Sequence, residues 1–257
     1  MTDAISADAT NPARYFYVLM GLASLAASVF AFAPFFFIPL ARGTLHVPPL
    51  YYIHATLFFA WMIYFMTQAW LAANGRLIAH REWGVLGAAL AAGMVFSVFA
   101  AVIGLLNQVP VPAAGAPGSP GFVWADVWTI LFFAVCVAAA LANTRRPETH
   151  KRLLLLGMIP LLFPPMGRWV AILAPGILRS PPTPLSPVEL GFLLLLSFAP
   201  AFLIVIAIAF DRKKRRRVSR IYVVGLLAYV TLVLTQPTVG RTSIWLSIAD
   251  AIQHIPG

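Results

Sequence analysis

Two histidines stand beside basic residues at the ends of long apolar segments, where their imidazole rings could bind a cofactor. His80 lies in GRLIAHREWG, and His150 lies in RRPETHKRLLLL. Imidazoles from two neighbouring helices can ligate a haem iron axially, and adjacent basic side chains can pair with the haem propionates. The residues therefore predict a haem site in which His80 and His150 are ligands and Arg81, Lys151 and Arg152 bind propionates.

The same two histidines have other uses that their residue types leave open. Imidazole beside arginine and lysine can bind a phosphate or a lipid headgroup instead, or can anchor a helix end at the membrane surface. The chain contains no Walker loop, no GxGxxG and no HExxH motif, and its one cysteine, Cys136, lies inside an apolar run. One cysteine cannot form a disulfide within the chain, so no thiol redox motif competes with the histidines.

A second polar group is expected near the opposite ends of the apolar segments. His54 and Glu189 stand near the start of two segments, and Asp126 and Arg168 stand at similar depth in two others. Histidine with carboxylates can bind a divalent metal or relay protons, so His54, Asp126 and Glu189 are candidate metal ligands, with His254 as a further member. Opposite charges at one depth favour a structural ion pair between Asp126 and Arg168. The same residues also suit a small-solute or proton-coupled transporter.

These side chains require a scaffold, and the composition indicates a helical membrane bundle. Hydrophobic residues make up 61% of the 257 residues and charged residues only 10%, whereas soluble domains are about half apolar and about a quarter charged. A helix that crosses the hydrocarbon core needs about 20 apolar residues. Seven segments meet this requirement, namely 15–40, 50–74, 84–106, 122–143, 153–178, 188–210 and 221–239. The prediction is one all-α polytopic transmembrane domain over residues 1–257.

Basic residues alternate between the connections of this predicted bundle. Fourteen lie in the N-terminal segment and in the second, fourth and sixth connections, against three in the remaining connections. The positive-inside rule places the basic side in the cytoplasm, and the N-terminus with it. The net charge of +10 is then explained by membrane orientation and by contact with the anionic headgroups of the bilayer, and not by nucleic-acid binding.

Local signals refine three of the predicted helices. Pro160, Pro164 and Pro165 predict a kink or break near Phe163, because proline removes a helix hydrogen bond. The small residues of GVLGAALAAG predict close packing and a central position for span 84–106. Gln68, inside the second span, is expected to bond to a neighbouring helix.

The C-terminal segment 241–257 is expected to lie on the membrane surface. Its residues TSIWLSIADAIQHIPG predict a short amphipathic helix at the outer side of the bundle. Ile244, Ile248 and Ile252 fall on one face of that helix beside Trp245, and Asp250 and Gln253 fall elsewhere.

The stretch HATLFFAWMIYFMTQAWLAANGRLIAHREWG, followed by THKRLLLLGMIPLLFPPMGR, resembles a widespread group of uncharacterised bacterial multi-pass membrane proteins. The resemblance is carried by His54, Trp61, Gln68, Gly75, Arg76, His80, Arg81, Gly84, His150, Lys151, Arg152 and Arg168. That group is distantly similar to four-helix haem-bearing membrane proteins of the cytochrome b type and to oxidase-assembly membrane proteins.

This resemblance covers about residues 50–170 and implies a core four-helix unit over that range. It implies haem b held by two histidines, a role in electron transfer or in oxidase-related assembly, and a place in the bacterial inner membrane. The chain departs from the two-haem pattern, because it lacks four histidines paired inside the spans.

Overall fold

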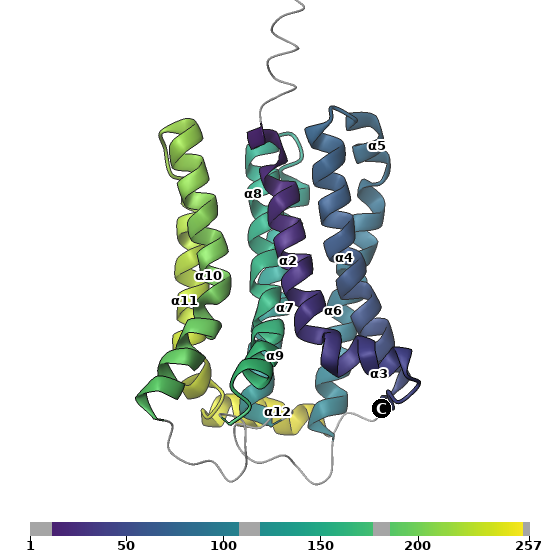
Figure 1. The fold of residues 1–257 in the computed structure, drawn as a ribbon, viewed down its shortest axis with the longest axis vertical. Helices are drawn as coiled ribbons and strands as arrows, with labels where there is room; N and C mark the ends of the chain where they lie inside the picture. Colours follow the sequence, from purple (N-terminus) through teal and green to yellow (C-terminus); the bar gives the residue numbers. More distant parts are fainter. Residues whose placement is uncertain (1–11, 108–118, 177–185, 254–257) are drawn as a thin grey trace, which may run out of the picture.

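The computed structural model describes residues 12–107, 119–176 and 186–253, and these residues form helices without any β-strand. Within this described part, seven helical segments are long and apolar enough to cross a membrane. They run over Ala13–Ala41, Pro49–Ala73, Leu77–Leu106, Val123–Ala142, Pro147–Leu173, Pro187–Lys214 and Arg220–Val239. The seven segments lie side by side as a bundle (Figure 1), which confirms the predicted all-α polytopic fold.

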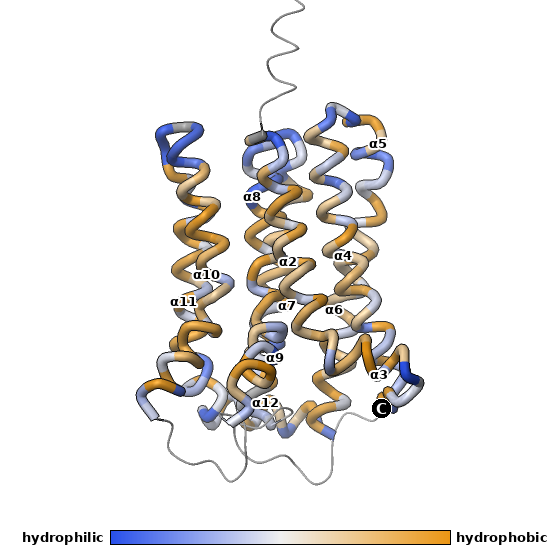
Figure 2. The backbone as a smooth tube through the Cα atoms, viewed as in Figure 1, coloured by the Kyte–Doolittle hydropathy of each residue, from blue (hydrophilic) through white to orange (hydrophobic). Residues whose placement is uncertain are grey.

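The outer surface of the bundle has the character expected of a membrane protein. Apolar residues cover the middle of the helices, and polar residues gather at the two ends (Figure 2). Large apolar side chains such as Val85 and Phe96 are about three-quarters exposed, at 77% and 75%. A continuous apolar surface is unfavourable in water and favourable in hydrocarbon. The chain is therefore an integral membrane protein.

The first four spans are built from helices that begin close to the predicted positions. A short 3-10 turn, η1 (Pro12–Tyr15), precedes α2 (Phe16–Phe32), which continues through the π-helical turn η2 (Ala33–Phe37) into α3 (Ile38–Ala41). The next elements are α4 (Pro49–Ala73), α5 (Leu77–Glu82), α6 (Gly84–Leu106) and α7 (Pro120–Ala142). Because α5 leads into α6, the third span starts seven residues earlier than predicted and includes His80.

The fifth span is broken where its prolines lie, as predicted. It consists of α8 (Pro147–Met158), the 3-10 segment η3 (Ile159–Leu162) and α9 (Phe163–Leu173). Pro160 falls in η3, and Pro164 falls in the first turn of α9. N–H groups in the first turn have no acceptor within the helix, so a proline there costs no helical hydrogen bond. The 3-10 segment η3 thus separates two α-helical parts within one span that is helical throughout.

This broken span, and not the third span, is the most enclosed part of the bundle. Its most apolar stretch is 61% buried, compared with 39% for the third span. The small residues of α6 do give the predicted close packing, since a Cβ on Gly87 would overlap the Tyr64 side chain of α4. They serve one face only, and the opposite face of α6 carries the exposed Val85 and Phe96.

The last two spans and the C-terminal helix complete the fold. Helices α10 (Pro187–Arg215) and α11 (Arg220–Val239) pack on each other, and α12 (Ser243–Gln253) crosses the lower end of the bundle (Figure 1). The helix predicted after the seventh span is present. Trp245 and Ala249 are buried against α6 and α7, whereas Ile244 and Ile248 are exposed.

Candidate functional site at the basic end of the bundle

The structure brings His80 and His150 together at one end of the bundle. His80 lies on the short helix α5, which follows a turn at Gly75 with a φ of +71°. His150 lies in the first turns of α8, after the turn that ends α7. The two ring centroids are 6.4 Å apart, and the ring planes are nearly perpendicular at 87°. This is the geometry of an edge-to-face ring contact, so the two imidazoles lie next to each other.

The hydrogen bonds around the two rings define which nitrogens face a ligand. The Nδ1 atom of His150 lies 2.8 Å from the carbonyl oxygen of Ala140. A carbonyl oxygen only accepts, so Nδ1 carries the hydrogen and Nε2 of the neutral ring keeps its lone pair. The Nδ1 atom of His80 is buried and has no hydrogen-bond partner among the described residues. Each ring can therefore present one unprotonated nitrogen.

Gln68 adds a further buried polar group near His80. Its side chain is only 7% exposed, and neither its amide nitrogen nor its oxygen has a partner within the described part of the chain. Its main chain interacts with the His80 side chain. The expected bond from Gln68 to a neighbouring helix is thus not formed directly. Buried polar atoms of this kind are normally satisfied by water or by a bound group.

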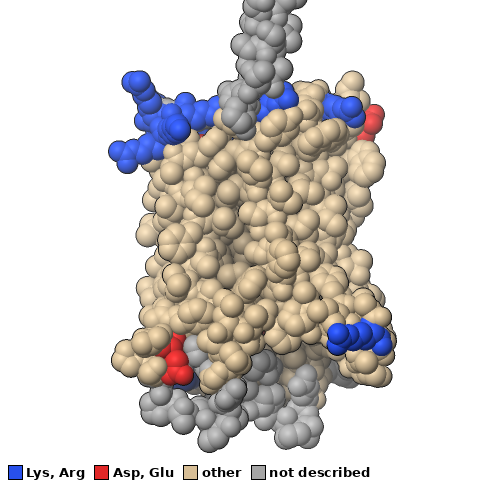
Figure 3. All heavy atoms as spheres, viewed as in Figure 1, with Lys and Arg blue, Asp and Glu red and all other residues tan. Residues whose placement is uncertain are grey.

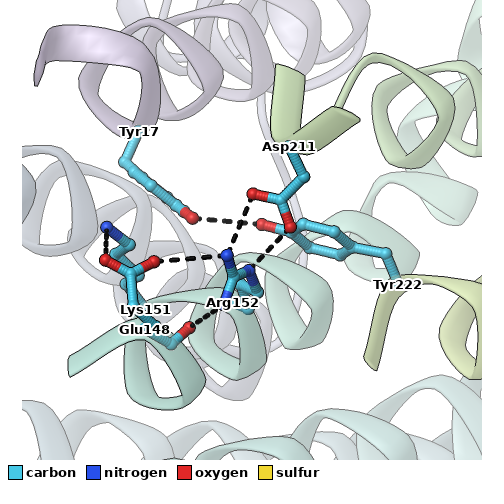
Figure 4. Close-up of polar contacts among 6 residues, drawn as sticks. All are labelled: Tyr17, Glu148, Lys151, Arg152, Asp211 and Tyr222. Atoms are coloured by element: carbon cyan, nitrogen blue, oxygen red, sulfur yellow. Dashed lines mark hydrogen bonds and ion pairs between the residues drawn. The ribbon is translucent and has the colours of Figure 1, made fainter. Parts of the chain in front are cut away.

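A second cluster at the same end joins Arg152 of α8 to Asp211 of α10 (Figure 4). The Arg152 guanidinium donates from Nε and Nη2 to the two Asp211 carboxylate oxygens, at 2.8 and 3.0 Å. Its Nη1 donates to the Glu148 carbonyl at 3.2 Å, and its Nη2 lies 3.2 Å from the Glu148 carboxylate. Arg152 is 8% exposed and Asp211 is 2% exposed. This two-point ion pair is buried between helices.

Tyrosines extend this cluster to two more helices. The hydroxyl groups of Tyr17 on α2 and Tyr222 on α11 are 3.3 Å apart, and Tyr222 is fully buried. Lys151 lies with its ammonium 2.7 Å from the Glu148 carboxylate and 5.2 Å from the centre of the Tyr17 ring. The cluster therefore ties α2, α8, α10 and α11 together at one end of the bundle.

The three residues predicted to bind haem propionates differ in whether a carboxylate of the chain already binds them. Lys151 and Arg152 are engaged with Glu148 and Asp211, because α10 continues to Arg215 and brings a carboxylate to them. Only Arg81 remains at the position that the haem prediction requires, next to His80 and exposed. Asp211 was missed as a functional residue, because the predicted sixth span ends at residue 210.

The second predicted group lies at the opposite end and is more dispersed. The Nδ1 atom of His54 lies 3.2 Å from the Ser97 hydroxyl. The Arg168 guanidinium donates to the Pro164 carbonyl at 3.1 Å and lies 4.2 Å above the centre of the Phe32 ring. Within the described ranges, Asp126 makes no direct ion pair with Arg168, although their charges interact at longer range.

Glu189 has a local role that separates it from the proposed metal ligands. Its carboxylate accepts hydrogen bonds from the Ser186 main-chain N–H at 2.8 Å and from the Ser186 hydroxyl at 2.7 Å. These contacts form a capping box at the start of α10. The described residues hold no group of three side chains that could bind a metal ion, so His54, Asp126 and Glu189 are not gathered. His254 lies outside the described residues.

One face of α4 connects the two ends. His54, Trp61 and Gln68 follow each other at intervals of seven residues, which returns to nearly the same helix face. Trp61 is 2% exposed, and its indole N–H has no acceptor among the residues that the structure describes. The face thus carries polar groups through the depth of the bundle, between the outer histidine and the His80–His150 pair.

Comparisons with known proteins add no relative to this description, since no family model, curated protein or solved structure matches the chain.

Proposed function

We propose that this protein is a membrane-embedded electron carrier that holds a haem iron between His80 and His150. The observation that carries the proposal is the spacing of the two rings, 6.4 Å between centroids with perpendicular planes. A metal–nitrogen bond is about 2.0 Å long, so two ligating nitrogens lie about 4 Å apart across one ion. Ring centroids stand somewhat further back than the nitrogens, which is compatible with the spacing seen.

The surroundings of the rings support a metal ligand role. A metal-ligating histidine commonly donates its second ring N–H to a carbonyl, which fixes the orientation of the ring. His150 has this contact with Ala140, and His80 has a buried nitrogen with no partner in the described residues. A bound haem would supply one-electron chemistry. The residues of the chain would fix the iron at one end of the bundle, with Arg81 beside it for a propionate.

The proposal also includes a location. The alternation of basic residues supports placing the His80–His150 end in the cytoplasm of a bacterial cell, with the chain in its inner membrane. Electrons would then enter or leave at the cytoplasmic face. The wider role that the resemblance implies, in electron transfer or in the assembly of an oxidase, rests on the same haem.

The absorption spectrum of the detergent-purified protein tests the proposal. Protein from haem-replete cells is expected to show a Soret band, and His80→Ala and His150→Ala are each expected to abolish it. His46→Ala is the matched control, because His46 is exposed and bonds only to the local Thr44 carbonyl. A colourless wild-type protein, or a band retained in both site variants, would overturn the proposal.

A second candidate function, proton-coupled transport, is favoured by the polar face of α4. From His54 to Gln68 the helix rises about 21 Å at about 1.5 Å per residue, and buried polar atoms recur along it at Trp61 and Gln68. Internal water at such atoms can relay protons between the two ends. Asp126 and Arg168 provide charges at the outer end.

Proton flux into proteoliposomes distinguishes this second function. Asp126→Asn and Gln68→Leu are expected to lower a flux that the wild-type protein supports. Glu189→Gln serves as the control, because its carboxylate is engaged in capping α10. Equal flux in protein-free liposomes and in liposomes containing the protein would exclude proton transport under those conditions.

A further inference from the structure

A cavity of about 350 Å³ lies beside the Arg152–Asp211 pair, at the junction of α8, α10 and α11. Its lining residues are Arg152, Asp211, Arg217, Val218 and Ser219. One water molecule takes up about 30 Å³ of liquid volume, so the cavity has room for a group as large as a phosphate with its water. It is separate from the His80–His150 pair and takes no part in the proposed haem site.

The cavity is lined by a buried arginine and by an exposed one. Arg152 is buried and is held in place by Asp211 and Glu148. Guanidinium has five N–H donors. Three of those in Arg152 are used in hydrogen bonds to Asp211 and Glu148, and Nη2 also lies 3.2 Å from the Glu148 carboxylate, which leaves one N–H of Nη1 for a ligand. Arg217 is exposed and makes no ion pair with any residue that the structure describes. Its side chain can therefore turn toward a ligand in the cavity.

Ser219 contributes neutral donors to the same wall. It occupies the N-cap position of the 20-residue helix α11, and its side chain makes no capping hydrogen bond. The first N–H groups of a helix lack partners within the helix, and the helix dipole favours an anion there. Ser219 lines the cavity, so its hydroxyl adds a neutral donor beside the two arginines.

The position of the cavity in the membrane indicates which chemical group it could bind. The sixth span ends at Lys214 and the seventh begins at Arg220, so the cavity lies between two spans where they leave the hydrocarbon. Lys and Arg gather at this end of the molecule, above an uncharged belt (Figure 3). Phosphate groups of membrane lipids lie at this level, and Arg binds phosphate through its fork of N–H donors.

We propose that this cavity is a binding site for a phosphate group, bound by Arg217, by the Ser219 hydroxyl at the start of α11 and by the one remaining Nη1 N–H of Arg152. The phosphate is carried by an anionic lipid headgroup or by a soluble phosphate compound, since both present the same oxygens. The Asp211 carboxylate keeps Arg152 oriented toward the cavity wall, and its own charge is neutralised by that pair. This site differs from general attraction of the basic segment to the membrane, because defined residues form it.

The test compares two variants that lose the same charge. Arg217→Gln removes a cavity arginine, and Lys213→Gln removes a cation from the same basic segment outside the cavity lining. The full-length protein in a zwitterionic detergent is titrated with short-chain phosphatidic acid, with phosphatidylcholine of equal chain length, and with inorganic phosphate. The thermal unfolding midpoint is the readout, because a ligand that binds the folded state raises it.

The wild-type midpoint is expected to rise saturably with phosphatidic acid or with inorganic phosphate, and not with phosphatidylcholine. Arg217→Gln is expected to weaken the apparent affinity about tenfold, the effect of losing one charge-assisted hydrogen bond, and Lys213→Gln is expected to leave it unchanged. A response to phosphatidic acid alone identifies the lipid as the source, and an equal response to phosphate identifies a soluble source. Both support the site.

Equal weakening in the two variants would show a diffuse charge effect and would overturn the proposal, as would the lack of any saturable response. Ser219→Ala is a second probe that leaves the charge unchanged and lies outside the Arg152–Asp211 pair. It is expected to weaken phosphate binding by a smaller factor than Arg217→Gln. Wild-type affinity in both Ser219→Ala and Arg217→Gln would also reject the site.

Discussion

Charged side chains meet directly at the basic end of the bundle, whereas at the opposite end they are kept apart. Arg152 and Asp211 are in contact at 2.8 Å across two helices. At the other end, Arg168 bonds to a carbonyl of its own helix and His54 to a serine hydroxyl. The same residue types therefore do different work. At one end they join helices, and at the other they contact neutral groups, namely a main-chain carbonyl and a serine hydroxyl.

The largest expected effect follows from breaking the direct pair. Asp211→Asn removes the buried counter-charge of the Arg152 guanidinium and leaves it only the Glu148 carboxylate, 3.2 Å from Nη2, which is expected to cost about 3 kcal/mol of folding free energy. The measurement is denaturant unfolding in mixed micelles, alongside the yield of monodisperse protein. Lys213→Gln, on the exposed part of the same segment, is expected to behave like the wild type.

A double variant separates charge from packing at this pair. Arg152→Met combined with Asp211→Leu removes both charges and keeps apolar volume, so it is expected to regain most of the lost stability. A double variant as unstable as Asp211→Asn would contradict the interpretation that the unpaired charge causes the loss. The comparison between the two ends would then need a different physical basis.

Packing at the basic end gives the next effect in size. A Cβ on Gly225 of α11 would overlap the Leu156 side chain of α8, whereas a Cβ on Gly104 of α6 would meet nothing within 4 Å. Gly225→Ala is therefore expected to destabilise by about 1–3 kcal/mol, as overpacking does. Gly104→Ala is expected to be neutral or to stabilise by about 0.5 kcal/mol. The same unfolding assay measures both, and equal values would refute the close α8–α11 approach.

The contrast between the ends also shows what the sequence can and cannot predict. The seven spans were predictable, because the length of an apolar segment depends on membrane thickness and not on its neighbours. The break near Phe163 was predictable as well, because proline removes a backbone donor wherever it lies. The sequence also placed His80 and His150 at the same membrane end, but their approach to 6.4 Å depends on how the helices pack.

The Arg152–Asp211 pair could not be predicted in this way. Its members are 59 residues apart, and their contact depends on the rotation of α10 and on its extension beyond the apolar run. A single acidic residue at the head of DRKKRRR was the available signal.

At the outer end, an aspartate-to-asparagine substitution is expected to lower the unfolding free energy by less than Asp211→Asn does. Asp126→Asn breaks no direct ion pair with a described residue, so it is expected to change the unfolding free energy by no more than about 1 kcal/mol. The measurement is made beside Asp211→Asn under identical conditions. Equal losses in the two variants would show that Asp126 and Arg168 are coupled as tightly as the inner pair.

The smallest effect is expected at the start of α10, where Glu189 and Ser186 bond reciprocally. Ser186→Ala is expected to lower the thermal midpoint by about 1–2 °C, the scale of one lost cap in a chain of this length. Because each side chain serves the other, Glu189→Ala is expected to give a similar shift, and the double variant is expected to add little to either. Additive shifts would mean that Glu189 makes a stabilising interaction besides the cap. Glu189 would then again be a candidate member of the outer polar group with His54 and Asp126.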